Sequence, residues 1–303
     1  MDKIIINGGK RLNGEVFIGG AKNAVLPIMT ACIIEPGKYV LNNVPDLRDT
    51  RTMARLIEMI GGTVQFNKNS MKINSINCNK PVAPYELVKT MRASFYVLGP
   101  FMSRYNYAEV SLPGGCAWGP RPVDFHLKAL EDMGANISLE RGNLISKGKL
   151  KGSNINFEKV SVGATGNILM ASVKAEGQTI INNAACEPEI TDLIDFLLKL
   201  GVKIDGRETS RLIVNGNKDL KNSFEHYVIP DRIEAGTFLI AVALAGGEVT
   251  LRDVNYKHLE IVISKLKDVG ARIVYDSNNI TITSSGKINP IDITTAVYPG
   301  FPT

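Results

Sequence analysis

The chain has 303 residues, of which 44% are hydrophobic and 21% charged, and its formal net charge is +5. This length predicts about two domains with sizeable cores, and this balance excludes a disordered chain. Lysine and arginine are spread along the chain without a run of either, which argues against a nucleic-acid partner and favours an anionic small molecule.

The N-terminal residues 1–9 predict a short strand and a turn. No basic region precedes a long apolar one, so we expect no signal peptide, and no apolar run reaches the roughly 18 residues of a membrane helix. The four cysteines and three histidines are scattered without metal-ligand spacing, so we expect no metal site. These features predict a cytoplasmic protein with reduced thiols and no membrane contact.

Along the chain, four helices are predicted to end on a glycine, at Gly61, Gly134, Gly201 and Gly270, roughly 70 residues apart. Apolar helices are predicted upstream, at residues 21–34, 164–175 and 234–245, and each is followed by a strand that starts at a glycine. We interpret this as a repeated βαβαββ unit. Helices that are apolar on all sides must be buried all round, which predicts inner helices with sheets outside, an inverted α/β arrangement.

The second unit carries an insertion, residues 113–122, with the sequence PGGCAWGPRP. Cys116 lies between glycines, five residues before Arg121. A nearby cation stabilises a thiolate, so this thiol could act as a nucleophile or a proton donor. The alternative is a surface turn with a stray cysteine. An insertion in one repeat out of four favours the functional interpretation.

The last part of the chain, residues 291–297, predicts the first strand of a fifth unit. The buried helix that should follow such a strand is missing before Thr303. We therefore interpret the chain as C-terminally truncated within a unit, with an apolar helix face of the second domain left uncovered. Such a face predicts aggregation or swapping.

Six motifs carry a resemblance to a known family: Gly20-Ala21-Lys22-Asn23-Ala24, Met91-Arg92-Ala93-Ser94, the Cys116 loop with Arg121-Pro122-Val123-Asp124, Val162-Gly163-Ala164-Thr165, Glu187-Pro188-Glu189-Ile190 and Pro230-Asp231-Arg232-Ile233-Glu234-Ala235-Gly236-Thr237. Together they resemble the UDP-N-acetylglucosamine 1-carboxyvinyltransferases, a branch of the enolpyruvyl transferases. The resemblance implies an inverted α/β barrel-like fold with two domains and the active site between them. It places the first domain at residues 22–229, and a discontinuous, incomplete second domain at residues 1–21 plus 230–303.

The resemblance also implies a reaction, the first committed step of peptidoglycan synthesis. In it, the enolpyruvyl group of phosphoenolpyruvate moves to the 3′-hydroxyl of UDP-N-acetylglucosamine, and phosphate is released without a cofactor. The chemistry needs a proton donor at carbon, cations for the phosphate and carboxylate, and a base for the hydroxyl.

The residue roles follow from the matched motifs. Cys116 corresponds to the proton donor, which also forms an adduct with phosphoenolpyruvate, and Arg121 would clamp phosphate oxygens. Lys22 and Asn23 open a buried helix, where an ammonium and a helix N-terminus form an anion site. The substrate-binding set is implied to comprise Lys22, Asn23, Arg92, Arg121, Pro122, Val123, Asp124, Phe125, Ser161, Val162, Gly163, Glu187 and Arg232.

Three of these positions have plainer alternatives. Arg92 could form a structural ion pair, Arg121 could form a salt bridge at the rim, and Arg232 could cap a helix instead of facing a cleft. We expect no chemical role for His126, on a helix face.

The sequence departs from the family pattern at its end, because the family's base, an aspartate directly after Phe-Pro-Thr, would follow Thr303. An arginine-bearing segment for phosphoenolpyruvate is also missing. Trp118 and Pro120 occupy loop positions where smaller or less rigid residues are common in the family, so we expect altered loop closure with the acid kept. The alternative is therefore an inactive fragment that only binds ligand. A shikimate-phosphate enolpyruvyl transferase is a weaker alternative, because that branch lacks the loop thiol.

Overall fold

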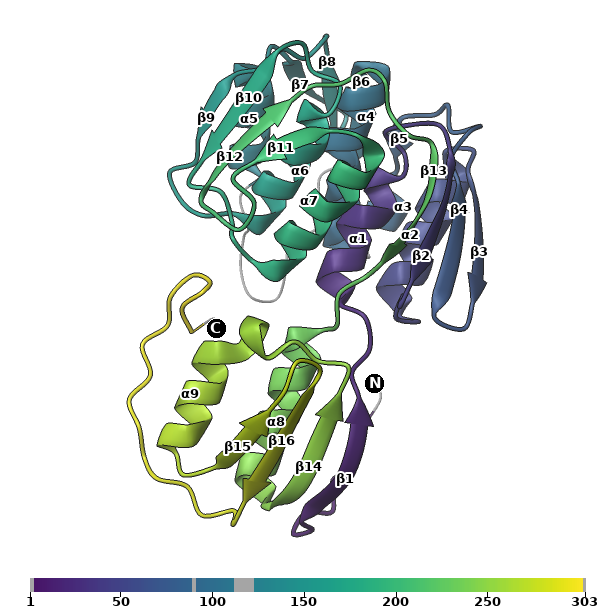
Figure 1. Cartoon of the computed structure of the whole chain (residues 1–303). Helices are drawn as coiled ribbons and strands as arrows, with labels where there is room; N and C mark the ends of the chain where they lie inside the picture. The colour runs from purple at the N-terminus through teal and green to yellow at the C-terminus, as the bar shows by residue number, and fades with distance from the viewer. Residues whose placement is uncertain (1–2, 89–90, 112–122, 302–303) are drawn as a thin grey trace. The chain divides into compact units, whose positions relative to one another are not determined.

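The computed structural model describes residues 3–88, 91–111 and 123–301 (Figure 1). The chain divides into two compact units, Gly20–Ile229 and a discontinuous unit of Met1–Gly19 with Pro230–Thr303. The boundary thus lies at Gly20, two residues before the predicted start of the first domain. Within the described ranges, no helix is both long and apolar enough to cross a membrane.

The larger unit holds a 3₁₀ helix at Arg92–Val97 and the helices α1 (Lys22–Ala31), α2 (Arg48–Met59), α3 (Tyr85–Val88), α4 (Leu98–Tyr105), α5 (Asp124–Asp132), α6 (Val162–Ser172) and α7 (Pro188–Leu200). Its strands are β2 (Lys38–Asn42), β3 (Thr63–Asn67), β4 (Ser70–Asn74), β5 (Val82–Ala83), β6 (Tyr107–Ser111), β7 (Asn136–Glu140), β8 (Asn143–Lys147), β9 (Asn154–Asn156), β10 (Gln178–Asn182), β11 (Lys203–Asp205), β12 (Arg211–Asn215) and β13 (Ser223–Tyr227). The smaller unit contains β1 (Leu12–Phe17), α8 (Arg232–Ala245), β14 (Gly247–Arg252), a 3₁₀ helix at Tyr256–Leu259, α9 (Glu260–Asp268), β15 (Arg272–Tyr275) and β16 (Asn279–Ser284).

The repeated unit appears as four sheets with one common topology. Their strand orders are β13-β2-β4-β3, β5-β6-β8-β7, β9-β10-β12-β11 and β1-β14-β16-β15. In each sheet the first two strands are parallel and the remaining neighbours antiparallel. The predicted helix-ending glycines Gly61, Gly134, Gly201 and Gly270 all have a positive φ, as a helix C-terminus of this type requires.

Two of the four sheets take their first strand from a distant part of the chain. β1 directly precedes α1 in the sequence but pairs with β14, and β13 directly precedes α8 but pairs with β2. The chain passes from one unit to the other after β1 and again after β13, and backbone hydrogen bonds hold each passage. The Ala21 amide donates to the Ile229 carbonyl within the larger unit, and the Asp231 amide donates to the Gly19 carbonyl within the smaller one, both at 2.8 Å. Sequence order alone would assign β1 to the sheet of the larger unit and β13 to the sheet of the smaller unit, but each strand completes a sheet in the other unit.

The core of the larger unit is built on two apolar helices. Every residue of α1 from Ala24 to Ala31 is buried, and so is every residue of α6 from Ala164 to Ser172. In Figure 1 these helices lie inside, with the three sheets outside them. All-round burial of the first helices is therefore confirmed for α1 and α6, and apolar area removed from water is the main source of stability here.

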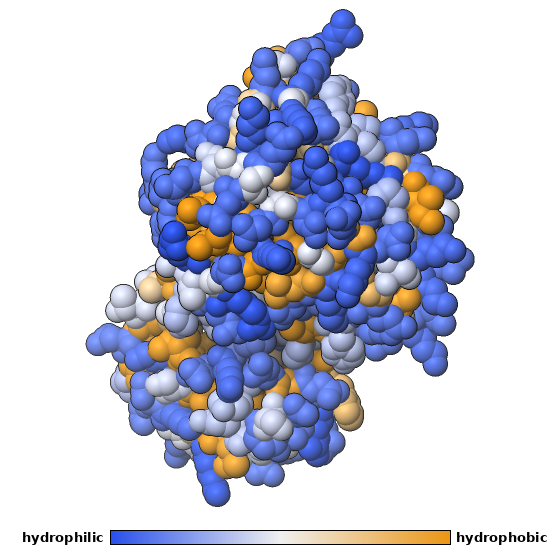
Figure 2. All heavy atoms as spheres, turned by 45° about the horizontal axis from the view of Figure 1, so that its top comes forward, coloured by the Kyte–Doolittle hydropathy of each residue, from blue (hydrophilic) through white to orange (hydrophobic). Residues whose placement is uncertain are grey.

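Helix α8 is a different case, although its sequence is just as apolar. Ile240 is 43% exposed and Leu244 is 59% exposed. The described part of the smaller unit has one sheet, which covers one side of α8, whereas three sheets enclose α1 and α6. The expectation of all-round burial is thus wrong for α8 within this unit, whereas the uncovered apolar helix face predicted for the second domain is present. Figure 2 shows hydrophobic residues at the surface among hydrophilic ones.

Two predicted strands are absent from the described residues. Residues 3–11 contain no strand, and Ile4, Ile5 and Ile6 are exposed, because the pairing with β14 begins only at Leu12. Residues 291–297 hold only an isolated bridge between Thr295 and Phe301. A strand needs a partner for its backbone groups, and this segment instead runs past α8 and α9, where it lines an apolar cavity of about 190 Å³.

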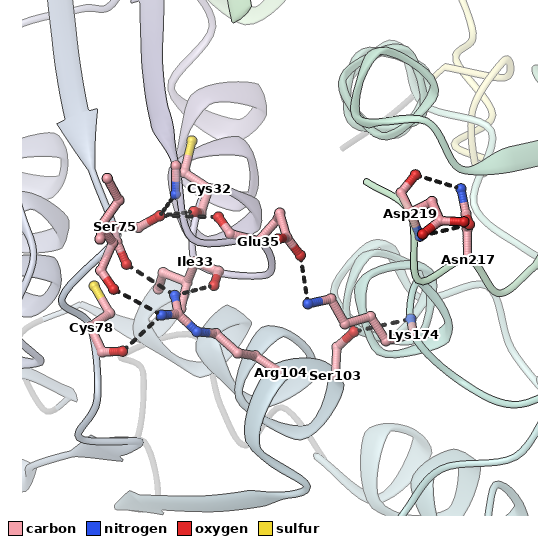
Figure 3. A network of polar contacts seen from close by, with 12 residues as sticks. Cys32, Ile33, Glu35, Ser75, Cys78, Ser103, Arg104, Lys174, Asn217 and Asp219 are labelled. Atoms are coloured by element: carbon pink, nitrogen blue, oxygen red, sulfur yellow. Dashed lines mark hydrogen bonds and ion pairs between the residues drawn. The ribbon is translucent and has the colours of Figure 1, made fainter. Parts of the chain in front are cut away.

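Arg104 on α4 joins the first and second repeats through backbone carbonyls (Figure 3). Its guanidinium donates to the carbonyls of Ile33 at 2.9 Å, Ser75 at 3.0 Å, Cys78 at 2.9 Å and Ile76 at 3.3 Å. The planar fork of an arginine can serve several acceptors at once, whereas a lysine ammonium cannot reproduce this geometry. The network therefore satisfies carbonyls at the end of α1 and in the loop after β4.

Replacing Arg104 with lysine should lower the free energy of unfolding by about 2–4 kcal/mol, because charge-assisted hydrogen bonds to partly buried carbonyls are lost. Urea denaturation of Arg104→Lys and wild-type protein measures this. Arg51→Lys is the matched control, since Arg51 pairs with Asp46 at the surface, and a change below about 1 kcal/mol is expected there. Equal losses in both variants would contradict a special role for the Arg104 network.

Candidate functional site

The start of α1 is held in place by a close backbone approach. A Cβ atom at Gly20 would lie 1.7 Å from the carbonyl oxygen of Asn43, so only glycine fits. The Asn43 side chain in turn donates to the Val228 carbonyl at 3.0 Å. The Gly-Gly turn before the helix therefore packs α1 against the strand ends beside it.

Lys22 is the first residue of α1, as the sequence predicts, and Asn23 beside it is exposed. The Lys22 Nζ lies 3.4 Å from Asp49 Oδ2 in the first turn of α2. An ammonium at a helix N-terminus adds its charge to the partial positive charge of the helix end. Asp49 is a neighbour that the sequence motifs did not reveal, because the contact joins two different helices.

The predicted nucleotide-sugar segments lie at the N-termini of two helices in contact, α5 and α6. Ser161 caps α6, where its hydroxyl accepts from the Ala164 amide at 3.3 Å. Val162 and Gly163 form the first turn of that helix. On α5, Val123 is the N-cap residue, Asp124 is exposed, and the Phe125 ring lies 6.4 Å from the Phe157 ring.

Between these two helix ends lies His126, for which the sequence predicted no chemical role. Its side chain is 8% exposed and makes a T-shaped contact with the Phe95 ring, with the ring centres 5.1 Å apart. The Asn167 Oδ1 accepts from the Gly99 amide at 2.8 Å, so Asn167 Nδ2 is the donor to His126 Nδ1 at 2.9 Å. Nδ1 is then an acceptor, and the imidazole is neutral with its hydrogen on Nε2.

Burial lowers the pKa of His126 to about 4. Removing a charged imidazolium from water is unfavourable, so the neutral ring is the form that this position stabilises. The sequence signal that could have found this contact was Asn167, a polar residue in the middle of an apolar helix. A buried amide needs partners, and His126 is one of them.

This low pKa makes stability depend on pH. The folded-state pKa of His126 is below the ordinary value of 6.5. The contribution of the neutral ring to the free energy of unfolding is therefore complete above about pH 6.5 and is lost as the pH falls towards 4. Between pH 7 and pH 5 we expect the His126 contribution to fall by about 2 kcal/mol. Chemical denaturation at both pH values should show this loss in wild-type protein and in His258→Asn, but not in His126→Asn. An identical pH dependence in all three would rule out the low pKa.

At α7, Glu187 is the N-cap residue and Pro188 opens the helix, with Glu189 buried in the first turn. Burial raises the pKa of Tyr96 well above its usual value, and the charges of Glu189 and Glu187 raise it further. The Tyr96 ring also lies against Gly166 of α6. Tyr96 belongs to the 3₁₀ helix at Arg92–Val97, so this helix lies close to the start of α7. Tyr96 was not predicted and Glu189 was noted only as part of a family motif, because their proximity depends on this packing.

Arg232 belongs to the smaller unit, where it is the first residue of α8. The helix is capped by Asp231, whose carboxylate accepts from the Ile233 amide at 2.8 Å and the Glu234 amide at 3.1 Å. The interpretation of Arg232 as the cap is therefore wrong. Its guanidinium carbon lies 5.2 Å from the centre of the Tyr298 ring, a cation–π arrangement.

Several predicted site residues lie outside the described residues: Cys116, Arg121 and Pro122, together with Trp118 and Pro120 of the same loop and the side chain of Arg92. The other thiols have raised pKa values. Burial raises that of Cys32 strongly, that of Cys78 to about 11, and also that of Cys186. None of these three is a thiolate at neutral pH. Among the residues that the structure describes, no cluster of metal-binding side chains occurs.

The chain is similar to known proteins in both sequence and structure. Residues 6–303 match the family EPSP synthase (3-phosphoshikimate 1-carboxyvinyltransferase). The chain is 46% identical over 304 residues to UDP-N-acetylglucosamine 1-carboxyvinyltransferase of Geotalea daltonii (strain DSM 22248 / JCM 15807 / FRC-32), and covers 73% of that protein. It is 48% identical over 307 residues to the protein of that name from Chlorobium luteolum (strain DSM 273 / BCRC 81028 / 2530), and covers 72% of it. Both alignments include 100% of this chain.

Solved structures agree on the fold. The enolpyruvyl transferase NikO from Streptomyces tendae has a TM-score of 0.87 at 20% identity, over 98% of this chain and 71% of that one. EPSP synthase from Acinetobacter baumannii has a TM-score of 0.71 at 19% identity, over 93% and 66%. The predicted inverted α/β fold is thereby confirmed, and the protein is of the enolpyruvyl transferase class. Within that class, the chain belongs to the UDP-N-acetylglucosamine 1-carboxyvinyltransferase family.

Proposed function

We propose that this protein transfers the enolpyruvyl group of phosphoenolpyruvate to the 3′-hydroxyl of UDP-N-acetylglucosamine and releases phosphate. The observation that carries the proposal is the identity of 46% and 48%, across the whole chain, to two proteins named for this transfer. The product would serve peptidoglycan synthesis, and with it cell shape and division. A cytoplasmic setting suits the free thiols of Cys32, Cys78 and Cys186.

In this proposal, cations bind the two negative groups of phosphoenolpyruvate. Lys22 and Asn23 stand at the N-terminus of α1, where an anion meets an ammonium and a helix end. Arg121 and Arg92 add guanidinium groups, which suit bidentate contact with phosphate or carboxylate oxygens. The Lys22 contact with Asp49 supports this role, because a carboxylate neighbour orients the ammonium while leaving it partly exposed.

The nucleotide sugar is assigned to the adjoining helix ends. Pro122, Val123, Asp124 and Phe125 lead into α5, and Ser161, Val162 and Gly163 open α6. Backbone amides at a helix N-terminus suit the negative charge of a diphosphate. Glu187 at α7 and Arg232 at α8 complete the proposed set of contacts.

Cys116 is the proposed proton donor. Its proton goes to the methylene carbon of phosphoenolpyruvate while the sugar hydroxyl, losing its own proton to a base, bonds to the neighbouring carbon. Elimination then returns the proton from the methyl group, breaks the bond to phosphate and leaves the enolpyruvyl ether. In the adduct, the sulfur of Cys116 takes the place of the sugar oxygen at the same carbon.

Phosphate release tests the function. The protein mixed with phosphoenolpyruvate and UDP-N-acetylglucosamine should release phosphate only when both are present, and shikimate 3-phosphate should not replace the sugar nucleotide. Release is followed by a colorimetric phosphate assay, and binding by calorimetry. Binding of both substrates without release would favour the alternative, a chain that only binds ligand.

Intact-mass measurement tests Cys116 separately. After incubation with phosphoenolpyruvate, wild-type protein should gain the mass of one phosphoenolpyruvate, because the thiol adds across the double bond without a leaving group. Cys116→Ser should lose the adduct completely, since a hydroxyl is a far weaker nucleophile at neutral pH. Cys186→Ser is the control and should keep the adduct, because Cys186 is the described cysteine that is partly exposed. An adduct that survives in Cys116→Ser would overturn the assignment.

A further inference from the structure

A buried carboxylate with no part in the proposed chemistry lies on α7, the helix that packs against α1. The side chain of Asp192 is 3% exposed, and its two oxygens meet two different donors. Oδ1 lies 2.9 Å from Nε2 of His226, and Oδ2 accepts from the Ile229 amide at 3.2 Å. A buried carboxylate is costly unless its oxygens are hydrogen-bonded, so these two contacts stabilise the side chain in one orientation.

His226 holds the carboxylate from one side, because packing fixes its own ring. The ring is buried, and its centre lies 5.5 Å from that of Phe196 in a T-shaped arrangement. Phe196 comes four residues after Asp192, on the same face of α7. A carboxylate can only accept, so Nε2 carries the hydrogen, and Nδ1 has no partner among the described residues. The second carboxylate oxygen is thereby directed at Ile229.

The Ile229 amide lies beyond the end of β13, where pairing with β2 has stopped. The Val228 amide still donates to a carbonyl of β2, but at Ile229 the Asp192 carboxylate takes the place of a strand partner. The Ile229 carbonyl in turn accepts from the Ala21 amide at 2.8 Å. One residue therefore connects the buried carboxylate of α7 to the residue that precedes Lys22.

Helix α1 depends on this connection, because no side chain caps its first turn. Its N-cap residue is Ala21, whereas Ser161 caps α6 and Asp231 caps α8 through their side chains. The bond from the Ala21 amide to Ile229, together with the close-packed glycine before it, fixes the direction in which α1 begins. Lys22 is the next residue, so the position of its ammonium depends on the same bond.

We propose that Asp192 is a positioning residue for Lys22. Its carboxylate holds Ile229, Ile229 holds Ala21, and Ala21 sets the start of α1. Asp192 is buried and acts only through the backbone, so its loss weakens anion binding at Lys22 and leaves the distant starts of α5 and α6 as they are. The identity of that anion as phosphoenolpyruvate rests on the proposed function.

Two substitutions separate positioning from the loss of a buried charge. Alanine at position 192 removes both acceptors. Asparagine also removes the charge, but its amide oxygen can still accept from the Ile229 amide, while its NH₂ group donates to Nε2 of His226 in the other tautomer of the ring. The opposite orientation of asparagine is disfavoured, because it would set two donors against each other. Both variants should lose stability, whereas only alanine should lose the Ile229 contact.

Steady-state kinetics measures the difference. Asp192→Ala should raise the KM for phosphoenolpyruvate roughly 10-fold, because a small displacement of a binding cation weakens its contact, and should leave the KM for UDP-N-acetylglucosamine within roughly twofold. Asp192→Asn should keep both values within roughly threefold. Asp195→Ala is the matched control on the same helix, where Asp195 pairs with Arg207 at the surface, and should change neither KM. Equal KM values for phosphoenolpyruvate in the alanine and asparagine variants would overturn the inference.

Hydrogen exchange covers the case in which Asp192→Ala fails to fold. Coupling between two sites is reciprocal, so saturating phosphoenolpyruvate should slow exchange of the Ile229 and Ala21 amides in wild-type protein by a similar factor, roughly 10-fold. The Lys38 amide, at the other end of the pairing between β2 and β13, should keep its rate. An unchanged exchange rate at Ile229 would overturn the inference without any substitution.

Failure of the proposed function is recognised separately. If wild-type protein releases no phosphate, but its Kd for phosphoenolpyruvate rises in Asp192→Ala and not in Asp192→Asn, the inference stands and the proposed function is wrong. If phosphate is released and both variants keep the wild-type KM for phosphoenolpyruvate, the inference is wrong and the proposed function stands. If wild-type protein neither releases phosphate nor binds phosphoenolpyruvate, both are wrong.

Discussion

The architecture of the larger unit depends on one constraint, the burial of helices that are apolar on every side. Helices α1 and α6 have no face that could meet water, so sheets must enclose them. Polar side chains buried among these helices are costly unless they find hydrogen-bond partners. Arg104 meets this condition with carbonyl oxygens, and Asn167 meets it with backbone groups of the neighbouring helix segments and with His126.

The same enclosure explains the location of the candidate site. Buried helices expose only their ends, and their first turns carry amides that the helix itself cannot satisfy. Lys22 at α1 and Ser161 at α6 stand at such ends. A ligand with several negative charges fits there because helix dipoles and cations act together. The core thus determines where anionic substrates are expected to bind, although its own residues are apolar.

Helix α8 shows how far a sequence pattern depends on its surroundings. It is as apolar as α1 and α6, yet Ile240 and Leu244 remain exposed because one sheet covers it. The strand exchange is a related case. β1 and β13 pair with strands far away in the chain, and the sequence of neither strand specifies its pairing partner. The pairing is seen only in the folded units, where β1 lies at the edge beside β14 and β13 at the edge beside β2.

The sequence by itself determined the repeated unit, the helix-ending glycines and the family motifs, because these depend on local backbone preferences and on short stretches of chain. It also placed Lys22 correctly at the start of a helix. Only the tertiary structure decided the partners of β1 and β13, the absence of a strand at residues 291–297 and the surroundings of His126 and Tyr96. These depend on contacts between distant segments, and burial can turn an ordinary histidine into a neutral donor at a helix end.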